Sequence, residues 1–280
     1  MTALTDWIGR SETLHDTLYP TPVVAMTATL DHPAAPVPAG TPLPPLWHWL
    51  YFLPSYRHSE AGPDGHPTRG GFLPPVPLPR RMWAGSQFEF HAPLRVGDAV
   101  SRTSTIHDVT VKEGRTGQLV FVKVRHELFA NGAADPSITE FHDIVYRDLK
   151  KPGDVDPPPQ AAPTGAAWRR EWRPDALMLF RYSALTFNGH RIHYDRPYVT
   201  QEEGYPGLVV HGPLIATLLM DLLRREAPGA EVATFRFKAV RPTFDGHPMQ
   251  VNGQRDGHTV KLWANDHDGW LTMDAVATLR

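Results

Sequence analysis

The residues best suited to chemistry lie between Phe187 and Gly212, in the segment FNGHRIHYDRPYVTQEEGYPGLVVHG. This segment contains three histidines, two arginines and three acidic residues, and it leads directly into the apolar run PLIATLLMDLL. Histidine has an ordinary pKa near neutrality, so it can both accept and return a proton. The segment could therefore be an acid/base site, a metal site or a solvated loop.

A metal site would need three or four ligands in a workable geometry. His190 and His193 form a His-x2-His pair, to which His211 and Asp195 could be added. The chain has no cysteine and no His-Glu-x-x-His motif, so two common kinds of zinc site are not indicated. We predict that the protein binds no metal and needs no cofactor.

The acid/base interpretation has a physical basis in the helix expected after the loop. Gly212 and Pro213 suit a helix start, where backbone N–H groups lack partners and the helix dipole is positive. Because glycine has no Cβ, a ligand atom can approach its N–H closely. A carbonyl oxygen bound there would be stabilised as it became an oxyanion. A histidine loop joined to such a helix start favours enolate chemistry.

The composition limits the class of protein. Lys and Arg number 28 and Asp and Glu 30, a formal net charge of -2, so no general attraction to nucleic acid or anionic lipid is expected. The absence of cysteine excludes disulfides and thiolate nucleophiles. The first segment, MTALTDWIGRSETLHDTL, lacks the regions of a signal peptide, and no apolar stretch reaches the ~20 residues that span a bilayer. We expect a soluble cytoplasmic protein without a nucleic-acid or membrane partner.

A proline-rich segment, KPGDVDPPPQAAPTG at 151–165, divides the chain and predicts an extended connector. On either side of it, SQFEFHAPLRVGDAV (86–100) and ATFRFKAVRPTFDGHPM (233–249) share the pattern Phe-x-Phe-x-Ala. We therefore predict a duplicated domain, with a first half at 1–150 and a second half at 166–280.

Alternating apolar and polar residues follow each of these repeats, in QLVFVKVRHELFA and DIVYRD, and in TVKLWAND and WLTMDAVATLR. This period of two predicts antiparallel strands with one buried face. One helix is expected before each strand set: a short aromatic one at 43–56 and a nearly all-buried one at 212–229. A buried helix followed by antiparallel strands, twice, predicts an α+β fold with a sheet curled around each helix.

The same residues resemble a known family. FNGHRIHYD followed by GLVVHGPL resembles the motif of MaoC-like (R)-specific enoyl-CoA hydratases, usually Gly-Asp-x-Asn-Pro-(Ile/Leu)-His and then a His-Gly step into the central helix. PPLWHWLYFLP, LPRRMWAGSQFEF and RYSALTFNGHRIHYDRPYV resemble the two-domain branch of mesaconyl-C4-CoA (3-methylfumaryl-CoA) hydratases, itaconyl-CoA hydratases and mitochondrial type 2 hydroxyacyl-thioester dehydratases. The resemblance covers nearly the full length and implies a double hot-dog fold.

The resemblance also implies roles for single residues. His193 matches the family's catalytic histidine, and Gly212 matches the glycine whose N–H forms the oxyanion hole. Asn188 stands where the usual motif has its catalytic aspartate, and an amide cannot take a proton from water at neutral pH. Because the closer branch also has asparagine there, the resemblance implies a variant enzyme in which His193 transfers the proton, and whether Asp195 assists His193 stays open.

The predicted reaction is the reversible addition of water across the 2,3 double bond of an acyl-CoA, with a branched or dicarboxylic acyl group such as mesaconyl-C4 or itaconyl. The first half lacks the motif, so we expect it to be non-catalytic and to bind the substrate. The candidate substrate-binding residues are His190, Arg191, Asp195, His211, Arg80, Arg81 and Trp83.

Two other functions stay open at this point. An acyl-CoA thioesterase on the same fold would direct water at the thioester carbon and release free CoA. A non-catalytic acyl-thioester binding module would need no base and would not turn over crotonyl-CoA. The sequence does not choose between CoA and an acyl-carrier protein as the carrier, and a homodimer is one assembly to be tested.

Overall fold

The computed structural model describes residues 3–114, 117–149 and 157–280. Its strands are β1 (Ser11–Thr17), β2 (Arg80–Phe90), β3 (Ala99–Gly114), β4 (Gly117–Ala130), β5 (Ile138–Arg147), β6 (Trp168–Trp172), β7 (Val232–Ala239), β8 (Met249–Asp256), β9 (Thr259–Asn265) and β10 (Leu271–Leu279). Its α-helices are α1 (Pro20–Thr29), α2 (Ala176–Thr186) and α3 (Gly212–Glu226). Short helical turns are η1 (Leu4–Trp7), η2 (Trp47–Leu50), η3 (His58–Glu60), η4 (Arg191–His193) and η5 (Tyr198–Glu202).

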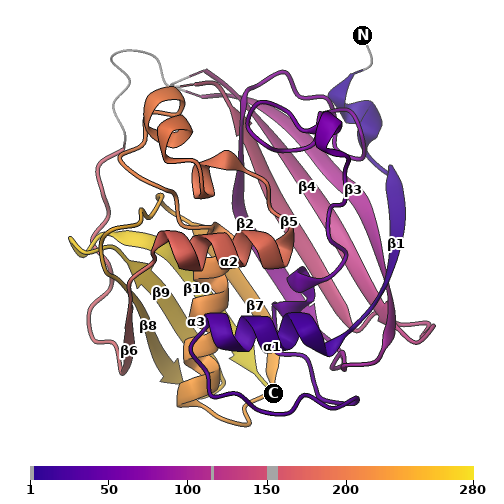
Figure 1. Cartoon of the computed structure of the whole chain (residues 1–280), viewed down its shortest axis with the longest axis vertical. Coiled ribbons are helices and arrows are strands. Elements are labelled where there is room, and N and C mark those ends of the chain that lie inside the picture. The colour runs from indigo at the N-terminus through magenta and orange to yellow at the C-terminus, as the bar shows by residue number, and fades with distance from the viewer. Residues whose placement is uncertain (1–2, 115–116, 150–156) are drawn as a thin grey trace.

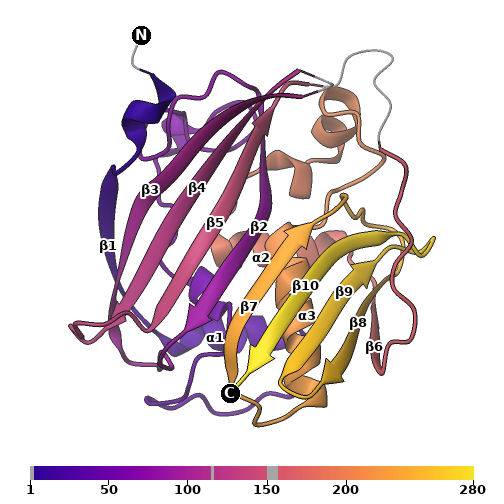
Figure 2. The same cartoon turned by 180° about the vertical axis from the view of Figure 1, so that it is seen from behind.

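The described strands form one antiparallel sheet of ten strands in the order β1-β3-β4-β5-β2-β7-β10-β9-β8-β6. Each half of this order repeats one pattern in mirror image, since β1 to β5 and β6 to β10 are arranged alike from edge to centre. Figure 1 shows the helices in front of the sheet, and Figure 2 shows the strands from behind. The expected duplication is therefore visible in the topology.

The repeated Phe-x-Phe pattern lies on the two strands that join the halves. Phe88 on β2 faces Phe235 on β7 in the register, and their rings stack with centroids 6.1 Å apart. Gly85 belongs to the same pairing, opposite Lys238. The repeat thus marks the seam at which one sheet becomes continuous with the other.

The helix predicted at 212–229 is confirmed as α3. Pro213 lies in its first turn, and the residues from Leu214 to Leu223 are buried. The helix packs against β6, β8, β9 and β10 of the second half. After it ends, Gly229 adopts a positive φ of 81°, a backbone conformation that glycine adopts at little cost.

The helix predicted at 43–56 is wrong. The chain there makes only the short turn η2, preceded by Leu46 in a left-handed conformation. Prolines at 44, 45 and 54 remove backbone donors on both sides, so a longer helix cannot form. The helices α1 and α2, which sequence periodicity did not predict, contact each other and η2.

The predicted connector at 151–165 falls partly outside the described residues, which omit 150–156. The division into 1–150, 151–165 and 166–280 therefore stays a proposal. In the described part of the chain, no helix combines the length and apolar character needed to cross a membrane.

The seam allows a test of the fold. A Cβ on Gly85 would lie 2.3 Å from the carbonyl oxygen of Phe237, so Gly85→Ala must push β2 and β7 apart. We expect the free energy of unfolding in urea to fall by about 1–3 kcal/mol. Gly71→Ala is the matched control, because a Cβ there meets no atom within 4 Å. Equal denaturation midpoints for the two variants would contradict this account of the seam.

Candidate functional site

The site begins where α2 ends. Asp175 caps the start of α2 by accepting a hydrogen bond from the Met178 N–H at 2.8 Å, and Phe187 ends the helix with a φ of 49°. The chain then turns sharply, and the Asn188 side-chain oxygen accepts a hydrogen bond from the His190 N–H at 3.0 Å. With its oxygen held by the loop, the Asn188 amide can still donate from its NH2 group.

His193 lies on the turn η4 and is 7% exposed. Its Nδ1 donates a hydrogen bond to the Val209 carbonyl oxygen at 2.7 Å, because a carbonyl can only accept. The same bond leaves Nε2 without a proton when the ring is neutral. Burial lowers the pKa of His193 to about 4, so the ring is a neutral base with its lone pair on Nε2 at physiological pH.

The ring of His211 packs against the ring of His193. The two rings stack with centroids 3.7 Å apart and an interplanar angle of 17°. His211 is completely buried, and its Nε2 is hydrogen-bonded to the Ser183 hydroxyl on α2 at 2.8 Å. Burial lowers the pKa of His211 well below its usual value. This placement favours a supporting role over direct substrate contact.

Gly212, the residue after His211, is the first of α3. His211 makes no side-chain capping bond to the helix, so the first N–H groups of α3 are not satisfied by a cap. A Cβ on Gly212 would meet no atom within 4 Å, which means that open space adjoins its backbone. A helix start with open space and positive dipole is suited to an oxyanion.

Arg191 and Asp195 form an ion pair within the loop. Arg191 Nε and Nη2 both donate to Asp195 Oδ2, at 2.9 and 2.7 Å, and its Nη1 donates to the Pro63 carbonyl at 2.8 Å. Asp195 Oδ1 accepts from the Tyr198 N–H at 3.1 Å, and these bonds lower the Asp195 pKa. Both charged groups are thus already paired, which weakens Arg191 as an anion binder and Asp195 as a helper of His193.

A loop of the first half docks on the loop from Asn188 to Asp195. The Arg191 N–H donates to the Asp64 carbonyl oxygen at 2.9 Å. Gly65 approaches Gly189 so closely that a Cβ on Gly65 would lie 1.9 Å from the Gly189 oxygen. The Tyr56 hydroxyl holds the docked loop by donating to the Gly65 oxygen at 2.5 Å. Residues of the first half therefore belong to the site.

The docked loop adds a histidine that the sequence analysis did not single out. His66 stacks on His190 with ring centroids 4.1 Å apart, and His190 meets His193 edge-on at 5.4 Å. Asp64 Oδ2 accepts from His66 Nδ1 at 2.9 Å. The Asp-Gly pair in PDGHPT signals a turn, but nothing local indicates that the turn meets a loop in the other half.

Asp64, His66 and His190 have possible ligand atoms within 4.8 Å of one another. This set differs from His190, His193, His211 and Asp195, which were considered from the sequence. The rings of His66 and His190 are tilted by 40° with their centroids 4.1 Å apart. His66 Nδ1 already donates a hydrogen bond to Asp64 Oδ2. Metal independence stays a prediction.

The three first-half candidates lie on β2 but differ in their partners. Arg80 is paired with Glu203, whose Oε2 lies 3.1 Å from Arg80 Nε. Trp83 donates to the Ser86 hydroxyl at 2.9 Å and stacks on His142 at 3.9 Å. Arg81 has no ion-pair partner among the described residues, although its positive charge helps to lower the pKa of His66.

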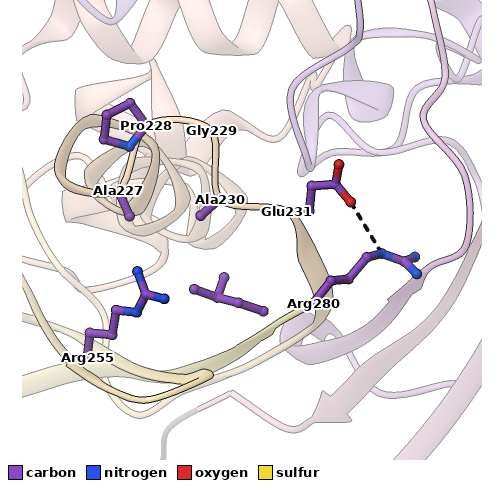
Figure 3. Close-up of a pocket in the computed structure, with 8 residues that line it drawn as sticks. Ala227, Pro228, Gly229, Ala230, Glu231, Arg255 and Arg280 are labelled. Carbon is purple, nitrogen blue, oxygen red and sulfur yellow. Dashed lines mark ion pairs between the residues drawn. The ribbon is translucent and has the colours of Figure 1, made fainter.

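A pocket of the described surface lies away from these residues (Figure 3). Its volume is about 390 Å³. The lining residues are Ala227, Pro228, Gly229, Ala230, Glu231, Arg255, Leu279 and Arg280. The first of these lining residues follows the last residue of α3, whereas His211 precedes the first residue of α3. A helix of 15 residues is about 22 Å long. The pocket is therefore separate from the histidine site.

Two solved structures share the architecture. HtdX of Mycobacterium tuberculosis superimposes with a TM-score of 0.67 at 17% identity, covering 96% of this chain and 99% of that one. A conserved hypothetical protein of the same organism, described as having a double hot-dog fold, gives a TM-score of 0.57 at 12% identity and covers 98% of this chain and 96% of its own. The predicted double hot-dog fold is confirmed.

Sequence comparison identifies the family. The family model "Hydroxyacyl-thioester dehydratase type 2" matches residues 46–245. The mesaconyl-C(4)-CoA hydratase of Chloroflexus aurantiacus is 45% identical over 273 residues, which cover 98% of this chain and 96% of that protein. The chain therefore belongs to the hydroxyacyl-thioester dehydratase type 2 family.

Proposed function

We propose that the protein catalyses the reversible hydration of a 2,3-unsaturated acyl-CoA to a 3-hydroxyacyl-CoA. The observation that supports this most directly is a buried, neutral His193 with a basic Nε2 near the open start of α3 at Gly212. Membership of a dehydratase family and the hydratase relative favour the same reaction.

In the proposed mechanism, His193 Nε2 accepts a proton from a water that the Asn188 NH2 group helps to position. The water oxygen bonds to Cβ, and the electrons of the double bond move toward the thioester carbonyl. The enolate oxygen is stabilised by the Gly212 N–H, a type of interaction typically worth ~3 kcal/mol. His193 then returns its proton to Cα, so the addition uses one water and leaves the enzyme unchanged.

For the substrate, we propose a branched dicarboxylic acyl group of the mesaconyl-C4 or itaconyl type, as the name of the relative suggests. The second half would supply His193, Asn188 and Gly212, and the first half would bind the acyl group without a base of its own. The cytoplasmic location and the homodimer stay predictions.

The alternatives differ in their products. A thioesterase would need water directed at the thioester carbon, whereas the enolate route needs the oxyanion site and one base that returns its proton. A binding module would have no use for a pre-oriented base. Loss of enoyl-thioester absorbance without release of free CoA, followed with mesaconyl-C4-CoA, itaconyl-CoA and crotonyl-CoA, would select hydration.

His193 is tested by His193→Ala and His193→Gln. Both remove the base, while glutamine keeps a side-chain donor for the Val209 oxygen. We expect kcat to fall by at least about 100-fold in both variants, because a positioned base contributes roughly 10²–10⁴ in rate. The glutamine variant should keep the wild-type melting temperature. If either variant retained most of its activity, the base would have to be another group.

Asn188→Asp tests the electrostatics of the base. Since the pKa of His193 is lowered to about 4, its basic form predominates above that pH, and kcat/KM should stay level from pH 8 down to about 5. A carboxylate at 188 would favour the imidazolium and raise the His193 pKa. The acid limb of kcat/KM, which reports the free enzyme, should then move to higher pH. An unmoved limb would argue against contact between the two side chains.

Gly212→Ala tests the oxyanion site. Because a Cβ at 212 meets no protein atom, we expect the melting temperature to be unchanged or slightly raised. The methyl group would occupy the space that the thioester oxygen needs, so kcat/KM should fall at least about tenfold. Gly71→Ala again serves as the control for stability. Full activity in Gly212→Ala would place the oxyanion elsewhere.

A further inference from the structure

The outer face of α2 carries a row of exposed apolar side chains. Leu177, Phe180 and Ala184 follow one another at spacings of three and four residues, which places them on one face of the helix. Leu177 is 54% exposed and Phe180 is 61% exposed, and Ala184 is also exposed. Phe187, the residue that ends the helix, is 48% exposed. We call Leu177, Phe180 and Ala184 the α2 stripe.

Helix α1 extends this apolar surface. It contacts α2, and both helices lie in front of the sheet in Figure 1. Met26 of α1 and Leu179 of α2 belong to the main core, so the opposite faces of the two helices point away from it. The outer face of α1 carries Val24, which is 50% exposed. A helix that is apolar on its outer face as well as its inner face is normally covered, which points to a partner.

A hollow of about 230 Å³ lies beside the α2 stripe, between the end of α1 and the start of α2. Ala28, Leu177 and Met178 supply apolar atoms to its wall, and the exposed ring of Phe180 lies one helical turn further along α2. In a two-fold symmetric interface each copy presents the same patch to the other. An exposed aromatic ring beside an apolar hollow gives one patch both of the complementary shapes that such an interface needs.

The charges around the hollow distinguish between kinds of partner. α1 has no charged residue and α2 has only one, an arginine, whereas helices that lie on membranes carry many Lys and Arg residues. The charges that line the hollow are two aspartates and two arginines, which cancel, so a second copy can set each sign against its opposite. An acidic protein or an anionic lipid surface would meet both carboxylates. The four charged lining residues are Asp31, Arg173, Asp175 and Arg181.

The area of the surface also suits a homodimer. Val24, Leu177, Phe180 and Phe187 are each about half exposed, and at roughly 200 Å² for a fully exposed large side chain they offer on the order of 400 Å². A standard interface buries about 800 Å² on each partner, and about 65% of a homodimer interface is apolar. These four side chains therefore supply most of the apolar area that one copy needs.

We propose that the outer faces of α1 and α2 form the interface of a homodimer, in which the α2 stripe of one copy packs across a two-fold axis on the α2 stripe and hollow of the other. This inference does not depend on the proposed hydration. The buried face of α2 carries Ser183, which is hydrogen-bonded to His211, so the interface lies one helix away from the histidine site.

The first test is sedimentation velocity over a wide range of micromolar concentrations. Wild type should sediment with twice the mass of one chain. Phe180→Asp and Val24→Asp each place two like charges in the apolar centre of a two-fold interface, so the dissociation constant should rise at least about 100-fold. Val111→Asp on β3 is the matched control, since Val111 is 47% exposed, and it should remain a dimer. Far-ultraviolet circular dichroism checks that each variant has folded.

The second test locates the interface without disturbing its centre. The chain has no cysteine, so a spin label on Arg181→Cys or on Val111→Cys reports one position in each copy. Labels at position 181, beside the α2 stripe, should lie closer together in the dimer than labels at position 111.

Three results would overturn the proposal. One is a wild-type protein that stays monomeric at every concentration, and binding of that monomer to phosphatidylcholine vesicles would assign the surface to a membrane instead. Another is a dimer that survives both Phe180→Asp and Val24→Asp, or that Val111→Asp dissociates equally. The third is a dimer in which the labels at 181 lie farther apart than those at 111.

Discussion

The hydrogen bond from His193 Nδ1 to the Val209 carbonyl is the contact on which the site depends. It selects the tautomer with a basic Nε2 and holds the ring plane. The Val209 segment is itself fixed, because the Val209 N–H donates to the Ile192 oxygen and the Val210 N–H to the Thr243 oxygen. The loop that carries His193 and the segment before α3 are therefore joined by backbone hydrogen bonds, and turning the ring of His193 would break its bond to Val209.

The two halves have diverged around this unit. In the second half α3 packs along β6, β8, β9 and β10 and presents its first turn to the site. In the first half the corresponding stretch between β1 and β2 holds α1, η2, η3 and a long connection. Part of that connection docks on the loop from Asn188 to Asp195, where Gly65 approaches Gly189. Among the described residues between β1 and β2 no helix is as long as α3, and the connection there brings Asp64 and His66 to the loop of the other half.

The features that could be predicted from the sequence are those set by residues close together in the chain. The alternating strands and α3 followed from periodicity, and His193, Asn188 and Gly212 from one contiguous motif. The turn η2 could not be predicted from such patterns, because Leu46 adopts a positive φ that only the surrounding packing explains. Asp64 and His66 could not be predicted either, since their contacts join residues more than a hundred positions apart. The pairing of Arg191 with Asp195 is likewise a matter of side-chain geometry, which spacing alone does not decide.

The proposed dicarboxylic substrate gives a physical reason for the asparagine at 188. In the usual motif this position holds an aspartate beside the catalytic histidine. If Cβ carries a carboxylate, an aspartate there would bring two negative charges within a few ångströms, and two like charges 4 Å apart repel by about 4 kcal/mol at an effective dielectric of 20. In the proposed mechanism asparagine removes that repulsion and keeps a donor for the water, while His193 transfers the proton. A neutral side chain at 188 therefore suits the proposed anionic substrate better than a carboxylate would.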